Sequence, residues 1–311
     1  MDLMQINPIE VPIIHEEPVA GLISTLALEP AGDELIGRSL PQVFSHVYGG
    51  QVIAQAMLAA AAVVRPDRVN NPHSLHVKFL RAGETDQPIS YEPLVVHGGK
   101  SFESVQVTAR QGDREMMVMF VSFQREQEGP AFSPAAPEVP GPDGLRSNLE
   151  VFRLVDNPVS KFLGKSTVFE ARHIDGNVYV RTQPAGAHRI WIRPRTQVEV
   201  SQVVGRAMLA YAVDQLVSEP LLRASGLSWS SPGLLLASLD HAMWFHRDFD
   251  VNQWVLLDLS CQFAGGARGL SAGRIFTQDG ELIASLSQEA MIRVVSEGGT
   301  WSFDGRGIPQ D

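Results

Sequence analysis

Two stretches of the chain have the pattern of a long buried helix. Residues 50–64 read GQVIAQAMLAAAAVV, which carries no charged side chain and is rich in alanine, a strong helix former. Residues 199–217 form the second stretch and have only two charged residues between their ends. A helix without a polar face must be covered on most sides. We therefore expect a sheet to wrap each helix.

Strand-like segments follow the first helix. Residues 74–82, 89–97 and 101–124 are rich in β-branched and aromatic residues, and a turn at residues 111–113 divides the last of them. Upstream of the helix, residues 21–38 read as short extended segments. The pattern predicts a helix followed by an antiparallel meander of strands.

The same order of elements occurs a second time, after a stretch at 127–145 that is dense in proline, glycine and acidic residues. Residue markers repeat as well, because Phe79 and Arg81 recur as Phe245 and Arg247, 166 positions later. An internal duplication is the economical explanation.

The duplication leads to a prediction of fold class and domain organisation. We expect an α+β fold, with two fused modules that each wrap an antiparallel β-sheet around a long central helix. The predicted parts are an N-terminal extension (1–18), an N-terminal module (19–126), a linker (127–164), a C-terminal module (165–297) and a C-terminal tail (298–311).

Composition narrows the function classes. The 311 residues are 44% hydrophobic and 19% charged, as expected for a folded chain, and the net charge of −10 gives no general attraction to nucleic acid or to an anionic membrane. The N-terminus lacks the pattern of a secretion signal, and no apolar run reaches the roughly 20 residues of a membrane span. These features predict a cytoplasmic protein that does not bind nucleic acid.

Cys261 is the single cysteine of the sequence. Because the chain has no second cysteine, an intrachain disulfide and a metal site with several cysteine ligands are excluded. We expect it to pack as a small hydrophobic side chain.

Asp214 is an acidic residue on an apolar helix. Helical spacing puts Ala207, Ala210 and Tyr211 on its face, so a buried carboxylate there would need polar partners. Asp214 is also close to the end of the helix, where it could simply reach solvent. The sequence pattern leaves both interpretations open.

Two further polar residues interrupt apolar strand patterns. Strict alternation along 234–249 puts Ser238 on one face with Asp240 and puts His241 on the other. In the last strand, Gln288 shares its face with apolar residues, so its amide needs hydrogen-bond partners. Each of the two could instead have a purely structural role.

The histidines of this strand suggest two other kinds of site. His241 and His246 could suggest a metal site, but five residues apart on a strand they point to opposite faces, so we expect no metal. Asp240 and His241 could form an acid–base dyad, and an imidazole beside Ser238 would favour that alternative.

Four segments carry a resemblance to a known family. They are YGGQVIAQAMLAA, LDHAMWFHRDFDVNQW, FTQDGELIASLSQEAMIR and the Ser101–Phe102 segment. With them, most of residues 20–295 resembles the TesB family of type II acyl-CoA thioesterases. The resemblance implies a double hot-dog fold and hydrolysis of acyl-CoA to free fatty acid and CoA, without a cofactor. It also implies a homo-oligomer, as a dimer or tetramer.

Site roles follow from the resemblance. An aspartate, a serine or threonine and a glutamine position the attacking water in that family, and the matching residues are Asp214, Ser238 and Gln288. Backbone N–H groups at Gly49, Gly50 and Gln51 are candidate oxyanion donors in a substrate-binding role, and those glycines could equally serve close packing alone. Lys100 and Arg268 are candidates for the CoA phosphates.

Some segments depart from the family pattern, and two other functions stay open. SFESVQV lacks the basic pair that related proteins have after Ser-Phe, and SCQFAGG replaces a serine-rich stretch, so the CoA and acyl contacts can differ. A non-catalytic acyl-CoA-binding protein is one alternative. An enoyl-CoA hydratase on the same fold is the other, although neither helix start shows the Asp and His that such an enzyme uses.

Overall fold

The computed structural model of the chain describes residues 12–14, 16–43, 46–65, 71–156, 158–179 and 184–295. The predicted C-terminal tail, and most of the predicted N-terminal extension, lie outside these ranges. Across the described ranges, no helix combines the length and the apolar character needed to cross a membrane.

The two halves of the chain contain similar sets of elements. The first half consists of α1 (Pro18–Leu26), β1 (Glu29–Ala31), β2 (Glu34–Gly37), α2 (Gly49–Val63), β3 (Asn71–Phe79), β4 (Ile89–Gly98), β5 (Phe102–Gln111) and β6 (Arg114–Gln124). The second half consists of α3 (Asn148–Leu154), α4 (Pro158–Ser166), β7 (Phe169–His173), β8 (Ala187–Pro194), α5 (Gln202–Leu216), α6 (Glu219–Ala224), β9 (Leu234–Phe245), β10 (Val255–Gly265), β11 (Arg268–Thr277) and β12 (Leu282–Val294).

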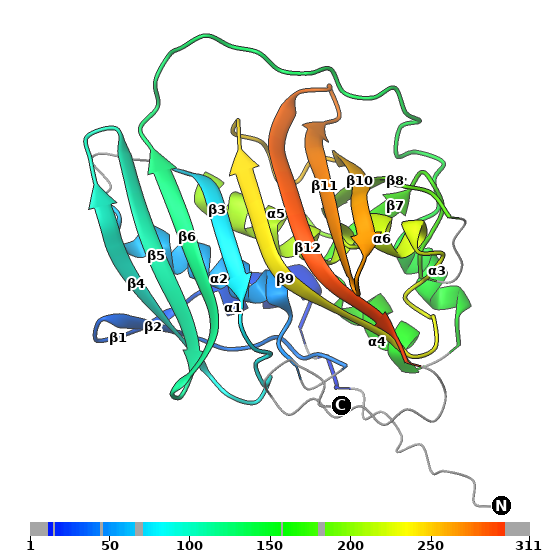
Figure 1. Ribbon diagram of the computed structural model, residues 1–311, viewed down its shortest axis with the longest axis horizontal. Helices are drawn as coiled ribbons and strands as arrows, with labels where there is room; N and C mark the ends of the chain where they lie inside the picture. The colour runs from blue at the N-terminus through cyan, green and yellow to red at the C-terminus, as the bar shows by residue number, and fades with distance from the viewer. Residues whose placement is uncertain are drawn as a thin grey trace, which may run out of the picture.

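The strands join into one antiparallel sheet (Figure 1). In the described residues its order is β1-β2-β4-β5-β6-β3-β9-β12-β11-β10-β8-β7. Outward from the central pair, β3-β6-β5-β4 on one side matches β9-β12-β11-β10 on the other, so the halves are arranged symmetrically. The central pair is antiparallel, with Val77 opposite His241. This arrangement confirms the predicted double hot-dog fold.

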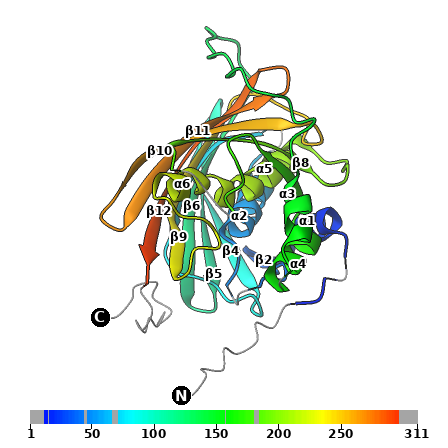
Figure 2. The same cartoon turned by 90° about the vertical axis from the view of Figure 1, so that its right-hand side faces the viewer.

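The two long helices lie against one face of the sheet, which we call the inner face. Figure 2 shows α2 and α5 within the curve of the sheet, with α1, α3 and α4 beyond them. Small side chains let the helices approach the sheet and each other: Ala56 and Ala60 of α2 and Ala207 and Ala210 of α5 are fully buried. This close packing explains why the two helix sequences are rich in alanine.

The start of the chain differs from the prediction of short extended segments at 21–38. Pro18 begins a helix, α1, and the Glu17 carboxylate caps it by accepting the Ala20 N–H at 2.9 Å. Leu22 and Leu26, four residues apart, are buried on one side of α1. The prediction of extended structure was therefore wrong for the first part of this segment, and it holds only for β1 and β2.

The predicted linker packs against the C-terminal half. Residues 127–146 have no helix or strand, and the segment that follows contains α3 and α4. The Trp191 Nε1–H donates to the Pro140 carbonyl at 2.9 Å, and Ala136 and Val139 pack on the same tryptophan cluster. Apolar contacts therefore hold this segment on the outer face of the sheet.

A buried carboxylate anchors α6 directly after α5. Glu219 accepts hydrogen bonds at Oε2 from Nε2 of His173 (2.9 Å) and Nε2 of His188 (2.7 Å), and at Oε1 from Nε1 of Trp229 (3.1 Å). Burial by itself would raise the pKa of Glu219, but the charge and hydrogen bonds of the two histidines outweigh it and hold the pKa well below its usual range. The carboxylate stays ionised and ties α6 to β7 and β8.

Removing this carboxylate should destabilise the fold. We expect Glu219→Ala to lower the free energy of unfolding by about 3–5 kcal/mol at pH 7, because two buried histidines and the partly buried Trp229 lose their acceptor. Urea unfolding monitored by circular dichroism measures the change. The depressed pKa means that the contribution is complete above the unfolded carboxyl pKa and is lost only as the pH falls below it.

Glu281 provides a matched control, because it is an exposed glutamate whose ion pair with Arg247 spans 3.5 Å. Glu281→Ala should cost no more than about 1 kcal/mol. Equal effects of the two substitutions would contradict an anchoring role for Glu219.

Candidate active site

Asp214 occupies the last turn of α5 and is only 4% exposed. The backbone N–H of Gly50, at the first turn of α2, donates a hydrogen bond to its carboxylate. Burial raises the pKa of Asp214 to about 6, although the Gly50 N–H and the Ser238 hydroxyl lower it in part. Of the two interpretations left open by the sequence, the buried carboxylate is the one observed.

The start of α2 and the end of α5 are joined by an interlocking contact. The Tyr48 hydroxyl donates to the Tyr211 carbonyl at 2.7 Å and accepts the Gln215 N–H at 3.1 Å. The two tyrosine rings meet edge to face, with centroids 5.0 Å apart. The first half therefore supplies a helix N-terminus to a carboxylate of the second half.

The structure brings Ser238 and Gln288 to the same carboxylate. The Ser238 hydroxyl donates to Oδ1 of Asp214 at 3.4 Å, and Nε2 of Gln288 lies 3.1 Å from Oγ of Ser238. The Gln288 amide also lies 2.9 Å from the Asp214 carbonyl and 2.9 Å from Oγ of Ser218. The three residues singled out from the sequence form one hydrogen-bonded group.

The predicted facing of Ser238 was wrong. Ala290 pairs with Ser238 and Glu289 pairs with Asp240, so a β-bulge leaves Leu239 without a partner on β12. The extra residue shifts the alternation by one, and Ser238 joins the inner face that His241 occupies. Strict period-two counting could not detect this shift.

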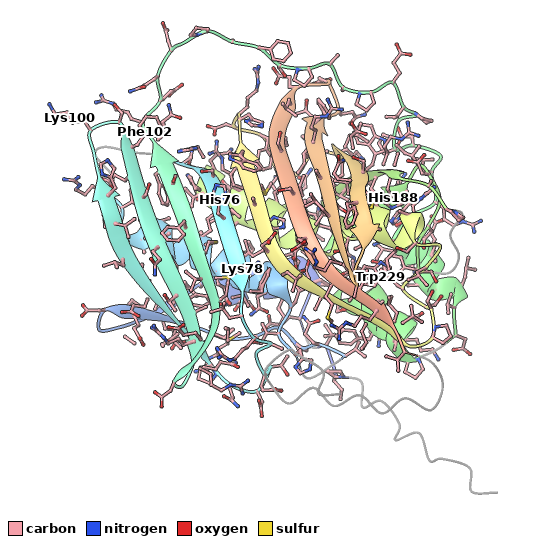
Figure 3. The ribbon with its side chains drawn as sticks, viewed as in Figure 1. His76, Lys78, Lys100, Phe102, His188 and Trp229 are labelled. Carbon is pink, nitrogen blue, oxygen red and sulfur yellow. The ribbon has the colours of Figure 1, made fainter. Side chains whose placement is uncertain are left out.

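The bulge also separates Asp240 from the histidine beside it. Asp240 is on the outer face, where its carboxylate accepts from Nζ of Lys78 at 3.1 Å. Figure 3 labels Lys78 in the middle of the sheet. The neighbouring residue, His241, is buried on the inner face. The two side chains therefore do not form the acid–base dyad considered from the sequence.

Two polar residues of the site were missed from the sequence as partners of Gln288. His241 contacts Oε1 of Gln288 through Nδ1 at 2.7 Å, and Ser218 contacts the same amide through its hydroxyl. His241 was assigned to the face opposite Ser238, and Ser218 was not singled out from the sequence. Only the bulge and the packing of β12 on α5 bring them to the amide.

The two glycines at the start of α2 make room for the site. A Cβ on Gly49 would lie 2.9 Å from Oδ2 of Asp214, and a Cβ on Gly50 would lie 2.5 Å from the Tyr211 carbonyl oxygen. Gln51 has a different environment, because its side chain bonds to the backbone of Leu40 and Arg38. The glycines border the carboxylate, whereas the Gln51 side chain holds a neighbouring loop.

The two basic residues predicted to bind phosphate lie on the surface. Lys100 is exposed in the turn between β4 and β5, at the upper edge of the sheet in Figure 3. Arg268 is exposed at the start of β11, where it forms an ion pair with Glu289. Glu289 accompanies Asp240 on the outer face, so this pair faces away from Asp214.

A cavity of about 530 Å³ lies beside the contact between α2 and α5. Tyr48, Tyr211 and Gln215 form one of its walls, and α1 and α4 contribute to the others. Its apolar lining comes from side chains that include Leu40 and Phe169. This volume lies within the range of pockets that bind small molecules.

One group of described residues has the composition of a metal site. His173, His188 and Glu219 bring their ligand atoms within 4.8 Å of one another. However, Nη1 of Arg223 lies 3.3 Å from Nδ1 of His188, so that nitrogen must accept and Nε2 must carry the proton. Metal on Nε2 would reverse this proton placement and bury a second positive charge beside Arg223. The donors fit the Glu219 carboxylate better than they fit a metal.

The sequence matches two family models. The acyl-CoA thioesterase N-terminal domain matches residues 39–124, and the acyl-CoA thioesterase C-terminal domain matches residues 130–292. Acyl-CoA thioesterase 2 of Haemophilus influenzae is 31% identical, over 88% of this chain and 96% of its own. Human acyl-coenzyme A thioesterase 8 is 30% identical, over 88% of this chain and 89% of its own.

Solved structures agree with these matches. The tesB protein of Mycobacterium avium subsp. paratuberculosis is 29% identical and superposes with a TM-score of 0.74, covering 89% of this chain and 99% of its own. Acyl-CoA thioesterase II TesB2 of Mycobacterium marinum is 30% identical with a TM-score of 0.71, covering 88% and 99%. The chain therefore belongs to the TesB-type acyl-CoA thioesterases.

Proposed function

We propose that the protein hydrolyses acyl-CoA thioesters by direct attack of a water molecule that Asp214, Ser238 and Gln288 hold in position. The observation that carries the proposal is the buried Asp214 carboxylate, which meets a serine hydroxyl and a helix N-terminus from the other half of the chain. Membership of the thioesterase family supports the reaction type.

Asp214 acts as the general base. With a pKa of about 6 it is mostly ionised at pH 7 and is more basic than an exposed carboxylate, which suits proton transfer from water near neutral pH. The Ser238 hydroxyl hydrogen-bonds to this carboxylate. Among the described residues, no histidine hydrogen-bonds to Ser238 to activate it as a nucleophile. Ser238 therefore positions the water and does not attack the thioester.

The oxyanion of the tetrahedral intermediate needs preorganised donors. The N–H groups of Gly49 and Gly50 at the start of α2 supply them, aided by the partial positive charge of a helix N-terminus. Gly50 already donates to Asp214 in this structure, so the substrate carbonyl would share or take over that donor.

The cavity that Tyr48 and Tyr211 line is the place we assign to the substrate chain, although Asp214 itself is not among its lining residues. The apolar side chains of its lining, which include Leu40 and Phe169, suit an acyl or pantetheine chain. Lys100 and Arg268 remain predictions for the CoA phosphates. Assembly into a dimer or tetramer likewise remains a proposal.

Replacing the base tests the mechanism. Asp214→Asn keeps the shape of the side chain and removes its basicity, so thiol release from acyl-CoAs of four to eighteen carbons should fall by about 100-fold or more. Asp240→Asn is the control, because Asp240 faces the outer side of the sheet. If the wild-type protein releases no thiol but binds acyl-CoA, a non-catalytic binding role takes the place of this proposal.

The rate should follow the ionisation of Asp214. We expect kcat/KM to fall as the pH drops through about 6, because the protonated carboxyl cannot accept a proton from water. A pH–rate profile of thiol release measures this limb. A profile that stays flat down to pH 4.5 would contradict Asp214 as the base.

The same carboxylate should reduce stability at high pH. Because the folded pKa lies above the unfolded value of 3.8, the ionised form is disfavoured in the fold, and the penalty grows as pH rises from about 4 to 6. Asp214→Asn should therefore be more stable than wild type at pH 8, by roughly 3 kcal/mol at most. Urea unfolding at pH 8 and pH 4 checks that the advantage disappears in acid.

A further inference from the structure

The side-chain amide of Gln288 has only one chemically acceptable orientation. One end of the amide lies 2.9 Å from the backbone carbonyl oxygen of Asp214, which can only accept a hydrogen bond. That end must be the NH₂ group, because two carbonyl oxygens at this distance would repel each other. The amide oxygen, Oε1, therefore faces the other way, toward His241.

This orientation determines the protonation of His241. Oε1 of Gln288 accepts only, so Nδ1 of His241, 2.7 Å away, must carry the hydrogen. Burial lowers the pKa of His241 to about 4, against the smaller raising effects of Gln288 and Asp240, so the ring is neutral at pH 7. The other nitrogen, Nε2, is then unprotonated, and it is buried without a hydrogen-bond partner in the described residues.

The amide orientation also determines which way the Ser238 hydroxyl points. The NH₂ group has two hydrogens: one goes to the Asp214 carbonyl, and the other is shared between Oγ of Ser218 at 2.9 Å and Oγ of Ser238 at 3.1 Å. Because the amide nitrogen cannot accept, the hydrogen of the Ser238 hydroxyl remains available to Asp214. A reversed amide would present an oxygen to Ser238, and the hydroxyl hydrogen would turn to it and leave the carboxylate. The direction of each hydrogen bond therefore depends on the one before it.

We propose that His241 is a positioning residue that acts through Gln288: its Nδ1–H holds Oε1 and so directs the hydrogen bonds from Gln288 through Ser238 to Asp214. This proposal rests on the proposed roles of those three residues. The backbone suits the task, because His241 and Gln288 are directly opposite each other on the paired strands β9 and β12. On its other side β9 pairs with β3, so His241 is held in the middle of the sheet.

Two substitutions at position 241 separate hydrogen bonding from packing. His241→Leu removes the donor, whereas His241→Asn keeps an N–H at nearly the same distance along the side chain. We expect His241→Leu to lower kcat by about 10- to 100-fold with little change in KM, and His241→Asn to recover most of the loss. Equal kcat in the two variants would overturn the proposal.

The control for these variants is His76→Leu. His76, which Figure 3 labels, lies on β3 next to β9. It is exposed and packs edge to face on Trp244. His76→Leu should leave kcat unchanged. A comparable loss there would show that any histidine of the central strands affects the rate through the sheet.

A double-mutant cycle shows whether His241 acts through the amide. In a Gln288→Leu background there is no Oε1 to hold, so adding His241→Leu should lower kcat by less than about twofold further. If the two losses multiply instead, His241 does not act through Gln288, and the proposal fails.

The tautomer can be read without measuring activity. In the full-length wild-type chain labelled with ¹⁵N-histidine, the signals that disappear in His241→Asn should show a neutral ring with its proton on Nδ1 at pH 7. A proton on Nε2 alone, or a charged ring, would overturn the proposal. This spectrum is independent of the Asp214→Asn assay, so a failure of the mechanism and a failure of the positioning role give different results.

Discussion

The contact between the first turn of α2 and the last turns of α5 is the interaction on which the site depends. It requires glycine at positions 49 and 50, because a side chain at either would collide with α5. It also requires Tyr48, whose hydroxyl bonds twice to the backbone of α5. The contact turns the positive end of one helix toward a carboxylate on the other, and neither half of the chain contains both.

The duplication explains the fold but does not give two equivalent sites. Both α2 and α5 have fifteen residues, and Ala61 stands at the position along α2 that Asp214 holds in α5. The first half therefore contributes a helix start and no matching carboxylate. The site is therefore built from different parts of two similar halves. A fused chain permits this, because its two modules can differ in sequence, whereas two copies of one module could not.

Two buried carboxylates near the end of α5 have opposite acidities, and their donors explain the difference. Glu219 receives three hydrogen bonds from nitrogen donors of side chains and stays ionised well below its usual pKa. Asp214 has one backbone N–H and a longer contact to a hydroxyl, so burial dominates and its pKa rises. The first arrangement stabilises the fold, whereas the second makes a base.

The sequence by itself determined the two modules, the buried helices and the polar residues that interrupt apolar patterns. Helical and strand periodicity are local properties, so Asp214 and Gln288 stand out without a structure. Tertiary structure decided the facing of Ser238 and the inclusion of His241, because a bulge at Leu239 is defined by pairing with β12 and not by the residues of β9. It also decided which N–H groups reach Asp214, since α2 and α5 are more than a hundred residues apart in the sequence and meet only by packing under a common sheet.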